Sequence, residues 1–289
     1  MEKIVVTTDL SANSRAAMRF AIQLAAQCNA QVVFLHVHQV LRTSFWSDEL
    51  YAQYIAHHKE NVLEELQPIV RSVCRSMNRT PFHFEIAVHH NLDVTDGILE
   101  YAADCDASCI CISTRGAGNI RKLFGTYTAA LLERSKHAVV CVPARQRIYP
   151  VAHIMYASDM KDYMYELLEV VNFTRPLQAK LTLFHIAYDY EFRPELSVME
   201  AQLKKQLDYP VRVTYCERDT NHSLTEDIEA QLKPVRQAVL VLFSEQRKGM
   251  VEKLLVPGSA RELSFHARQV FISFPKRHVT QQKLTRKRN

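Results

Sequence analysis

Lys3-Ile-Val-Val-Thr-Thr-Asp9-Leu10 begins the chain with an apolar run that ends in a hydroxyl residue and an aspartate. The same pattern returns in the second half as His153-Ile-Met-Tyr-Ala-Ser-Asp159-Met160. Two further segments repeat in the same order. Val-Phe-Leu-His36-Val matches Thr-Leu-Phe-His185-Ile, and Gly125-Thr126 matches Gly258-Ser259. Three matched segments in one order indicate that the chain contains two copies of one unit.

Strand and helix patterns alternate through both copies. In the first copy, strands are predicted over Lys3–Thr8, Gln31–His38, Phe82–Val88, Ala107–Ser113 and Ala138–Val142, and helices over Ser14–Cys28, Asp48–Met77, Val94–Asp104 and Thr126–Ser135. In the second, strands are predicted over His153–Ala157, Lys180–Ala187, Val211–Cys216, Ala238–Phe243 and Val270–Phe274, and helices over Tyr163–Phe173, Pro194–Leu207, Leu224–Leu232 and Ser259–Phe265. We expect Ser47 to cap the second helix. The alternation predicts an α/β fold with a parallel sheet and helices on both faces.

The length of 289 residues suits two domains of ordinary size. We predict an N-terminal domain over 1–146, a C-terminal domain over 150–276 and a basic tail over 277–289, with Ala144–Pro150 as the linker. Six of the 36 Lys and Arg residues lie at or after Lys276, where no acidic residue occurs, so the net charge of +5 belongs to the tail. The tail is either a solvated, mobile terminus or a segment that touches nucleic acid or anionic surfaces; we favour the first interpretation and expect no nucleic-acid partner.

Composition indicates a globular protein without a membrane segment. Hydrophobic residues make up 47% of the chain, but no apolar run approaches the roughly 20 residues that cross a bilayer. The N-terminus has no signal-peptide pattern, so we predict a soluble, cytoplasmic protein. The seven cysteines fit a reducing compartment. Cys105, Cys109 and Cys111 could form a metal or redox cluster, but buried free thiols are the more ordinary interpretation.

One segment has the chemistry of an anion-binding loop. It runs from Ser113 to Thr128, between a buried strand and a helix, and holds three of the six glycines of the chain. Glycines let backbone N–H groups approach an anion, and a helix N-terminus adds its positive dipole end. Hydroxyls and positive charges accompany them at Thr126, Thr128, Arg115, Arg121 and Lys122. The alternative is a surface loop followed by a capped helix.

Other polar residues leave more than one interpretation. Asp9 and Asp159 follow the first strand of each copy, where each either accepts hydrogen bonds from a ribose or base or caps the next helix. The pairs His57-His58 and His89-His90 are adjacent residues, an arrangement poorly suited to metal binding. Structural packing at the rim of the sheet is the favoured role of His36 and His185, although both could line a pocket. No acid–base pair stands out, so we predict no enzymatic activity beyond a slow ATPase.

These motifs resemble those of the universal stress protein family, in its tandem two-domain form. The resemblance covers nearly the whole chain apart from the tail. It rests on Val6-Thr-Thr-Asp9-Leu-Ser11, on Leu35-His36-Val37, and on Ser113-Thr-Arg-Gly116, which eight residues separate from Gly125-Thr126. This sequence has Ser113 where the family has its first glycine, and its loop is one residue shorter. The resemblance implies a five-stranded parallel sheet of order 3-2-1-4-5 in each domain, with the two domains paired through their last strands as an internal pseudo-dimer.

The resemblance also implies a ligand, ATP or a related adenine nucleotide, with or without Mg²⁺. Carried over by position, Thr7, Thr8 and Asp9 border the adenosine, and the backbone of Val37 meets the base. The phosphates are then surrounded by Gly116, Gly125, Thr126 and Thr128, with Ser113 and Arg115 beside them. The second copy has Phe243-Ser-Glu-Gln246 in place of the first glycines, so we expect it to serve as a partner domain without ATP.

The leading functional hypothesis is therefore a stress-response regulatory protein that binds an adenine nucleotide in its N-terminal domain. It would signal through an unidentified protein partner, with further homodimer formation left open. The alternative hypothesis is a nucleotide-independent interaction scaffold of the same fold.

Overall fold

The computed structural model describes the whole chain except residues 79–82, 115–125, 189, 192, 245–268 and 276–289. The strands are β1 (Lys3–Thr7), β2 (Gln31–His38), β3 (Phe84–His90), β4 (Cys109–Ser113), β5 (Ala138–Val142), β6 (His153–Ala157), β7 (Lys180–Ala187), β8 (Val211–Glu217), β9 (Ala238–Ser244) and β10 (Phe271–Pro275). The helices are α1 (Arg15–Cys28), α2 (Asp48–Ser76), α3 (Val94–Asp104), α4 (Thr126–Arg134), α5 (Tyr163–Thr174), α6 (Leu196–Leu207) and α7 (Leu224–Leu232), with a short 3₁₀ helix η1 (Arg175–Leu177).

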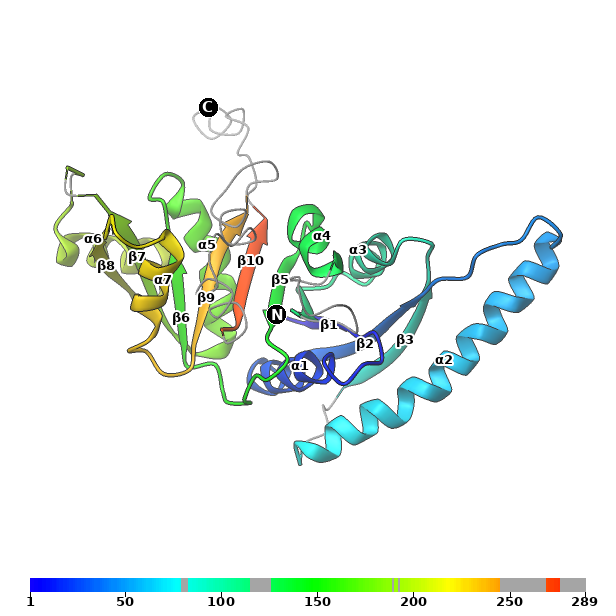
Figure 1. Cartoon of the computed structure of the whole chain (residues 1–289). Helices are drawn as coiled ribbons and strands as arrows, with labels where there is room; N and C mark the ends of the chain where they lie inside the picture. The colour runs from blue at the N-terminus through cyan, green and yellow to red at the C-terminus, as the bar shows by residue number, and fades with distance from the viewer. Residues whose placement is uncertain (79–82, 115–125, 189, 192, 245–268, 276–289) are drawn as a thin grey trace, which may run out of the picture.

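All these strands lie in one sheet, in the order β3-β2-β1-β4-β5-β10-β9-β6-β7-β8 (Figure 1). Within each half the strands are parallel, and each half has the predicted order 3-2-1-4-5 counted in its own strands. The halves join through β5 and β10, which pair antiparallel with Val140 opposite Ile272. The predicted fold class is confirmed, and so is the predicted pairing of the two halves through their last strands.

Most predicted elements agree with the structure to within two residues at each end. Ser47 caps α2 as predicted, because its side chain accepts a hydrogen bond from the Leu50 N–H at 3.2 Å. The start of α6 at Pro194 is wrong: Glu195 keeps an extended backbone, with ψ of 123°, so the helix begins at Leu196. The helix predicted over Ser259–Phe265 and the tail predicted over 277–289 lie outside the described residues.

Two hydrophobic clusters lie on the two faces of the sheet. The first cluster gathers the buried sides of α1, α2, α5 and α6, and the second gathers those of α3, α4 and α7. Along β2, Val32 and Phe34 belong to the first cluster, whereas Val33 and Leu35 belong to the second. This alternation follows from the two-residue period of a strand, and it explains why buried parallel strands are apolar throughout.

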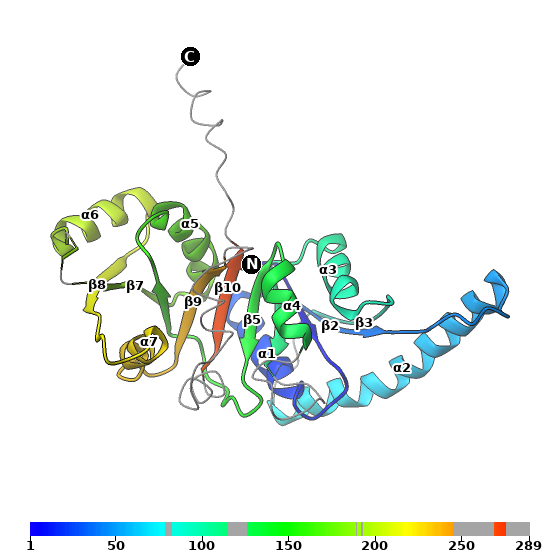
Figure 2. The ribbon, with the colours of Figure 1, turned by 45° about the horizontal axis from the view of Figure 1, so that its top comes forward.

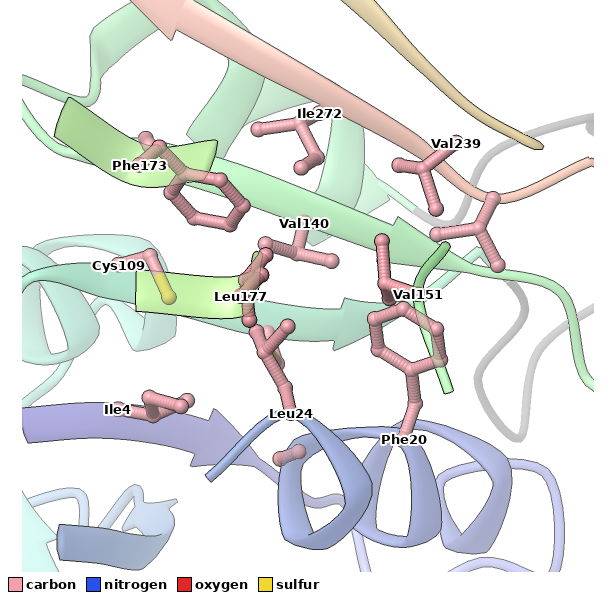
Figure 3. Close-up of a cluster of buried hydrophobic side chains, with 14 of the residues drawn as sticks. Ile4, Phe20, Leu24, Cys109, Val140, Val151, Phe173, Leu177, Val239 and Ile272 are labelled. Atoms are coloured by element: carbon pink, nitrogen blue, oxygen red, sulfur yellow. The ribbon is translucent and has the colours of Figure 1, made fainter. Parts of the chain in front are cut away.

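The first cluster continues without a break from one half of the chain into the other. Phe20 and Leu24 of α1 point toward Val151 and toward Leu177 of η1 (Figure 3). The side chain of Gln27 also fixes the connecting segment, because it donates to the Val151 carbonyl at 3.2 Å and accepts from the Val151 N–H at 2.8 Å. The predicted linker therefore leads into a segment that is packed and hydrogen-bonded against α1.

Helix α2 lies along the outer edge of the first half, beyond β3, and its N-terminal part extends away from the sheet in both views (Figure 1, Figure 2). Residues 48–61 include no buried side chain, and we call this part the α2 arm. The remainder of α2 buries Val62, Leu66 and Val70 against the sheet. None of the helices in the described part of the chain is long and apolar enough to cross a bilayer.

Candidate functional site

A cavity of about 350 Å³ lies at the carboxyl ends of β1, β2 and β4. This is the point where the strand order of the first half reverses, which is the usual ligand position in an open α/β sheet. The volume falls within the range of about 300–1,000 Å³ that is typical of small-molecule sites. The lining residues are Thr7, Thr8, Asp9, Ser14, Leu35, His36, Val37, His38, Gln39, His58, Val94, Ile98, Ile112, Ser113, Tyr127 and Thr128.

The turn after β1 is held by hydroxyl groups. Ser14 donates its hydroxyl hydrogen to the Ser11 carbonyl at 2.8 Å, so the Thr8 hydroxyl donates to Ser14 Oγ, also at 2.8 Å. Thr8 Oγ1 in turn accepts the Leu10 N–H at 3.0 Å, with Leu10 in the left-handed region at φ 62°. This network fixes the backbone of the turn and leaves Thr8 buried at the base of the cavity.

Asp9 does not cap helix α1, so that interpretation is wrong. The helix begins after Ser14, whereas Asp9 Oδ1 accepts hydrogen bonds from the N–H and the hydroxyl of Ser11, at 3.1 and 2.6 Å. The side chain is thereby held in a local turn, exposed and at the cavity wall. In the second half, Asp159 accepts the Lys161 N–H at 3.0 Å in the same way, and Asp162 stands at the start of α5.

His36 lies at the end of β2, and its Nδ1 is 2.8 Å from the Thr8 carbonyl oxygen. A carbonyl oxygen only accepts, so Nδ1 carries the hydrogen. Burial lowers the pKa of His36, and the Thr8 hydrogen bond and the Asp9 charge oppose that effect only in part. The ring is therefore neutral at neutral pH, and its Nε2 presents a lone pair.

His38, the last residue of β2, contacts the α2 arm beside the cavity. Its Nδ1 lies 2.9 Å from Nδ1 of His58, and its ring centroid is 5.0 Å from that of His58 and 5.3 Å from that of His90. His38 is buried, and its Nε2 has no hydrogen-bond partner among the described residues. Burial first, and then the neighbouring His58, His90, His36 and Lys59, lower the pKa of His38 to about 4.

The C-terminal end of β4 and the first turn of α4 form another wall of the cavity. Thr128 donates its hydroxyl hydrogen to the Ser113 carbonyl at 3.2 Å, and both side chains are buried. The Ser113 hydroxyl has no partner among the described residues. Thr126 begins α4 with an exposed side chain and is not part of the cavity lining, so its role stays a prediction. Arg115, Gly116 and Gly125 lie outside the described residues.

Of the ten predicted site residues, the structure thus brings six to one cavity: Thr7, Thr8, Asp9, Val37, Ser113 and Thr128. His38, His58 and Tyr127 were not predicted as site residues. The two-residue period of β2 could have found His38, because it places His36 and His38 on the same face. Nothing in the sequence indicates that His58, on a different element, meets them.

The matching region of the second half carries different side-chain contacts. His185 Nδ1 lies 2.7 Å from the Ser158 carbonyl, as His36 does from Thr8, but His185 Nε2 is also 2.7 Å from the Glu191 carboxylate. The registers of β4 and β9 place Phe243 where the first half has Ser113. Its ring is stacked on Phe274, with centroids 5.3 Å apart. The role of the second half as a partner domain stays a prediction.

The cysteines have the properties of packed side chains. All seven are free, and Cys109, Cys111 and Cys141 are fully buried. Burial raises the pKa of Cys141, and a hydrogen bond to Cys109 followed by burial raises that of Cys111, the reverse of an activated thiol. Among the described residues, no cluster of three or more His, Cys, Asp or Glu side chains could hold a metal ion.

Comparisons with known proteins identify one matching family and several similar solved structures. Residues 1–143 match the model of the universal stress protein family, whereas no curated protein matches the chain. A universal stress protein from Archaeoglobus fulgidus DSM 4304 aligns with a TM-score of 0.68 and 18% identity, over 94% of this chain and 98% of that one. A functionally unknown protein from Pseudomonas aeruginosa PAO1 aligns with a TM-score of 0.53 and 11% identity, over 95% and 92%. A universal stress protein from Archaeoglobus fulgidus in complex with dAMP aligns with a TM-score of 0.34 and 22% identity, over 49% and 98%.

Proposed function

Residues 1–143 of the chain belong to the universal stress protein family, and from this premise we propose a stress-response regulatory protein that binds ATP or a related adenine nucleotide. The cavity of the first half is the proposed site. One observation carries the proposal: side chains that the sequence motifs single out, at the ends of three separate strands, line a single cavity of ligand size at the strand-order reversal.

The chemistry of the cavity supports a nucleotide. Leu35, Val37, Ile98 and Ile112 supply apolar walls of the kind that cover a purine. Hydroxyls of Thr8, Ser14, Ser113 and Thr128 lie toward the ends of β1 and β4 and could take part in polar contacts. The buried Ser113 hydroxyl is the clearest case, because a ligand acceptor would satisfy a donor that has no partner among the described residues.

The sequence after Ser113 supplies the charge that a polyphosphate needs. Arg115, Arg121 and Lys122 lie in the sequence between β4 and α4, a segment that also contains Gly116 and Gly125. Charge-assisted hydrogen bonds from such residues contribute roughly 1.5–3 kcal/mol each. We therefore assign the phosphates, with any Mg²⁺ they carry, to this loop and the start of α4.

The proposal is one of ligand sensing rather than catalysis. Nucleotide binding in the first half would change how the chain engages a protein partner, and the second half would act as the fixed partner domain. We further propose that the protein acts in the cytoplasm. Phosphate release from ATP at a rate that Asp9→Ala abolishes, without loss of binding, would overturn the non-enzymatic part of this proposal.

The direct test is urea unfolding of the full chain with and without ATP and Mg²⁺. A ligand that binds only the folded state adds about 2.7 kcal/mol to the unfolding free energy at 100 times its Kd. Asp9→Ala should reduce this stabilisation, whereas Asp159→Ala, the matched change in the second half, should leave it intact. Absence of any stabilisation by ATP, ADP or AMP contradicts the proposal.

The second half provides the observation that favours the alternative, a nucleotide-independent scaffold. There, the Glu191 carboxylate contacts His185 and Phe243 stacks on Phe274, so side chains of the chain itself make contacts in the region that matches the cavity. The scaffold hypothesis predicts equal unfolding free energies with every nucleotide, together with a protein partner that both Asp9→Ala and the wild type retain.

A further inference from the structure

His36 is a group in the cavity whose hydrogen-bonding state is set by the fold. Its Nδ1–H is committed to the Thr8 carbonyl, so the neutral ring has an acceptor at Nε2. Nε2 makes no hydrogen bond to the described residues, and it is not among the polar atoms sealed from solvent. The ring itself lines the cavity. An accessible acceptor therefore lies at the β2 end of the site.

The second half of the chain displays what this position does when a partner is present. His185 repeats the contact of His36, with Nδ1 2.7 Å from the Ser158 carbonyl. There, Nε2 is 2.7 Å from the carboxylate of Glu191, which comes from the segment after β7. The hydrogen bond from His185 lowers the pKa of Glu191. Because a carboxylate accepts, Nε2 of His185 donates in this contact. The two halves therefore share a histidine whose Nε2 is directed toward a possible partner, but Nε2 of the neutral His36 ring is an acceptor.

We propose that His36 is a ligand-contacting residue whose Nε2 accepts a hydrogen bond from the nucleoside part of the bound nucleotide. The inference rests on the proposed function and extends it to a residue that fixes the ligand's orientation. Phosphate oxygens are acceptors at neutral pH, and two acceptors do not pair, so the phosphates lie away from His36, toward Ser113 and Thr128. The donors that an adenine nucleotide offers are its two ribose hydroxyls and the 6-amino group.

The experiment is calorimetric titration of the full chain with ATP, 2′-deoxy-ATP, 3′-deoxy-ATP and purine riboside triphosphate, which lacks the 6-amino group. His36→Asn keeps an amide N–H near the Thr8 carbonyl but removes the group at Nε2. His36→Gln places an amide oxygen near the Nε2 position. His185→Asn is the matched control in the second half, where no nucleotide is expected.

We expect His36→Asn to weaken ATP binding about 3- to 10-fold, the value of one ordinary hydrogen bond. His36→Gln should weaken it less, and His185→Asn should leave it unchanged. One analogue should bind the wild type about 3- to 10-fold more weakly than ATP. The same analogue should bind His36→Asn no more weakly than it binds the wild type, because the hydrogen bond is already lost. The group missing from that analogue is then the donor to Nε2.

Two results overturn the inference while the proposed function stands. The first is that His36→Asn binds ATP with the affinity of the wild type. The second is that each analogue loses the same affinity relative to ATP in the wild type and in His36→Asn. If His36→Asn fails to fold, the affinities of the wild type for the four nucleotides test the inference. Equal affinity for all four contradicts it, because no group of the ligand then donates a hydrogen bond to Nε2. Absence of nucleotide binding by the folded wild type refutes the proposed function and this inference together.

Discussion

Acidification should destabilise the protein through His38 more than through any exposed histidine. In the folded chain His38 is buried, and Nδ1 is 2.9 Å from Nδ1 of His58 on the α2 arm. The positively charged or titratable groups that face it are His58 and Lys59 from α2, His90 from β3 and His36 from β2. Burial, followed by these neighbours, lowers the pKa of His38 from 6.5 to about 4.

The sign and size of the effect follow from proton linkage. Between pH 6.5 and pH 4 the unfolded chain binds a proton at His38 that the folded chain does not, so stability falls as pH falls. Each unit of pKa difference corresponds to about 1.4 kcal/mol, which gives a loss of about 2 kcal/mol by pH 5 and about 3 kcal/mol below pH 4. Above pH 6.5 the residue makes no pH-dependent contribution.

The assay is urea unfolding of the wild type and His38→Phe at half-unit steps from pH 7.5 to 4. The phenyl ring keeps most of the imidazole's volume but does not titrate, so the variant's stability should fall less steeply in this window. His57→Phe, an exposed neighbour of His58 on the same helix, is the control and should follow the wild type. Parallel curves for the wild type and His38→Phe would refute the reasoning.

Three other substitutions test contacts of the fold and site. Gly97→Ala would place a Cβ 2.7 Å from Cγ1 of Val37, so we expect a loss of about 1–3 kcal/mol in urea unfolding, and unchanged stability would contradict the packing described. Ser113→Ala removes a buried hydroxyl that lacks a partner among the described residues; its Tm without nucleotide should be unchanged or higher, and a lower Tm would indicate a hydrogen bond at that hydroxyl. Glu191→Gln weakens the contact with His185, which is partly open to solvent, so the loss should stay below about 1 kcal/mol. Because the folded pKa of Glu191 is lowered, this loss should be present at neutral pH and vanish as pH falls below that pKa, with ATP affinity unaffected.

Local sequence signals are sufficient for most of the elements. The apolar run of β2, the capped start of α2 at Ser47 and the length of α3 all follow from periodicity and capping within the element. Errors occur where a distant partner decides. Strand β3 continues to His90 because His89 and His90 pair with Val37 and His38 of β2, which strand propensity does not indicate. The late start of α6 is a local exception: Glu195 stays extended although the preceding proline suits a helix start, and its carboxylate accepts a hydrogen bond from the nearby Ser197 hydroxyl.

The candidate site could be predicted in part for the same reason. Thr7 ends β1, Thr8 and Asp9 follow it, and Ser113 ends β4, so a parallel sheet brings them to one edge. The meeting of His38 with His58 depends on how α2 packs against that edge, and no local pattern specifies this packing. The residues of the glycine loop from Arg115 to Gly125 stay sequence predictions, since they lie outside the described part of the chain.

By itself, the sequence predicted the repeated order of elements in the two halves, the alternation of strands and helices, and the strand ends at which a ligand could bind. Periodicity and turn chemistry are properties of neighbouring residues, so they can be read along the chain. Only the tertiary structure decided that Gln27 forms hydrogen bonds with Val151 and that His38 contacts His58. It also decided that the Glu191 carboxylate contacts Nε2 of His185, whereas Nε2 of His36 stays accessible. These contacts join elements that are separated in sequence, and their geometry is set by packing that no single segment contains.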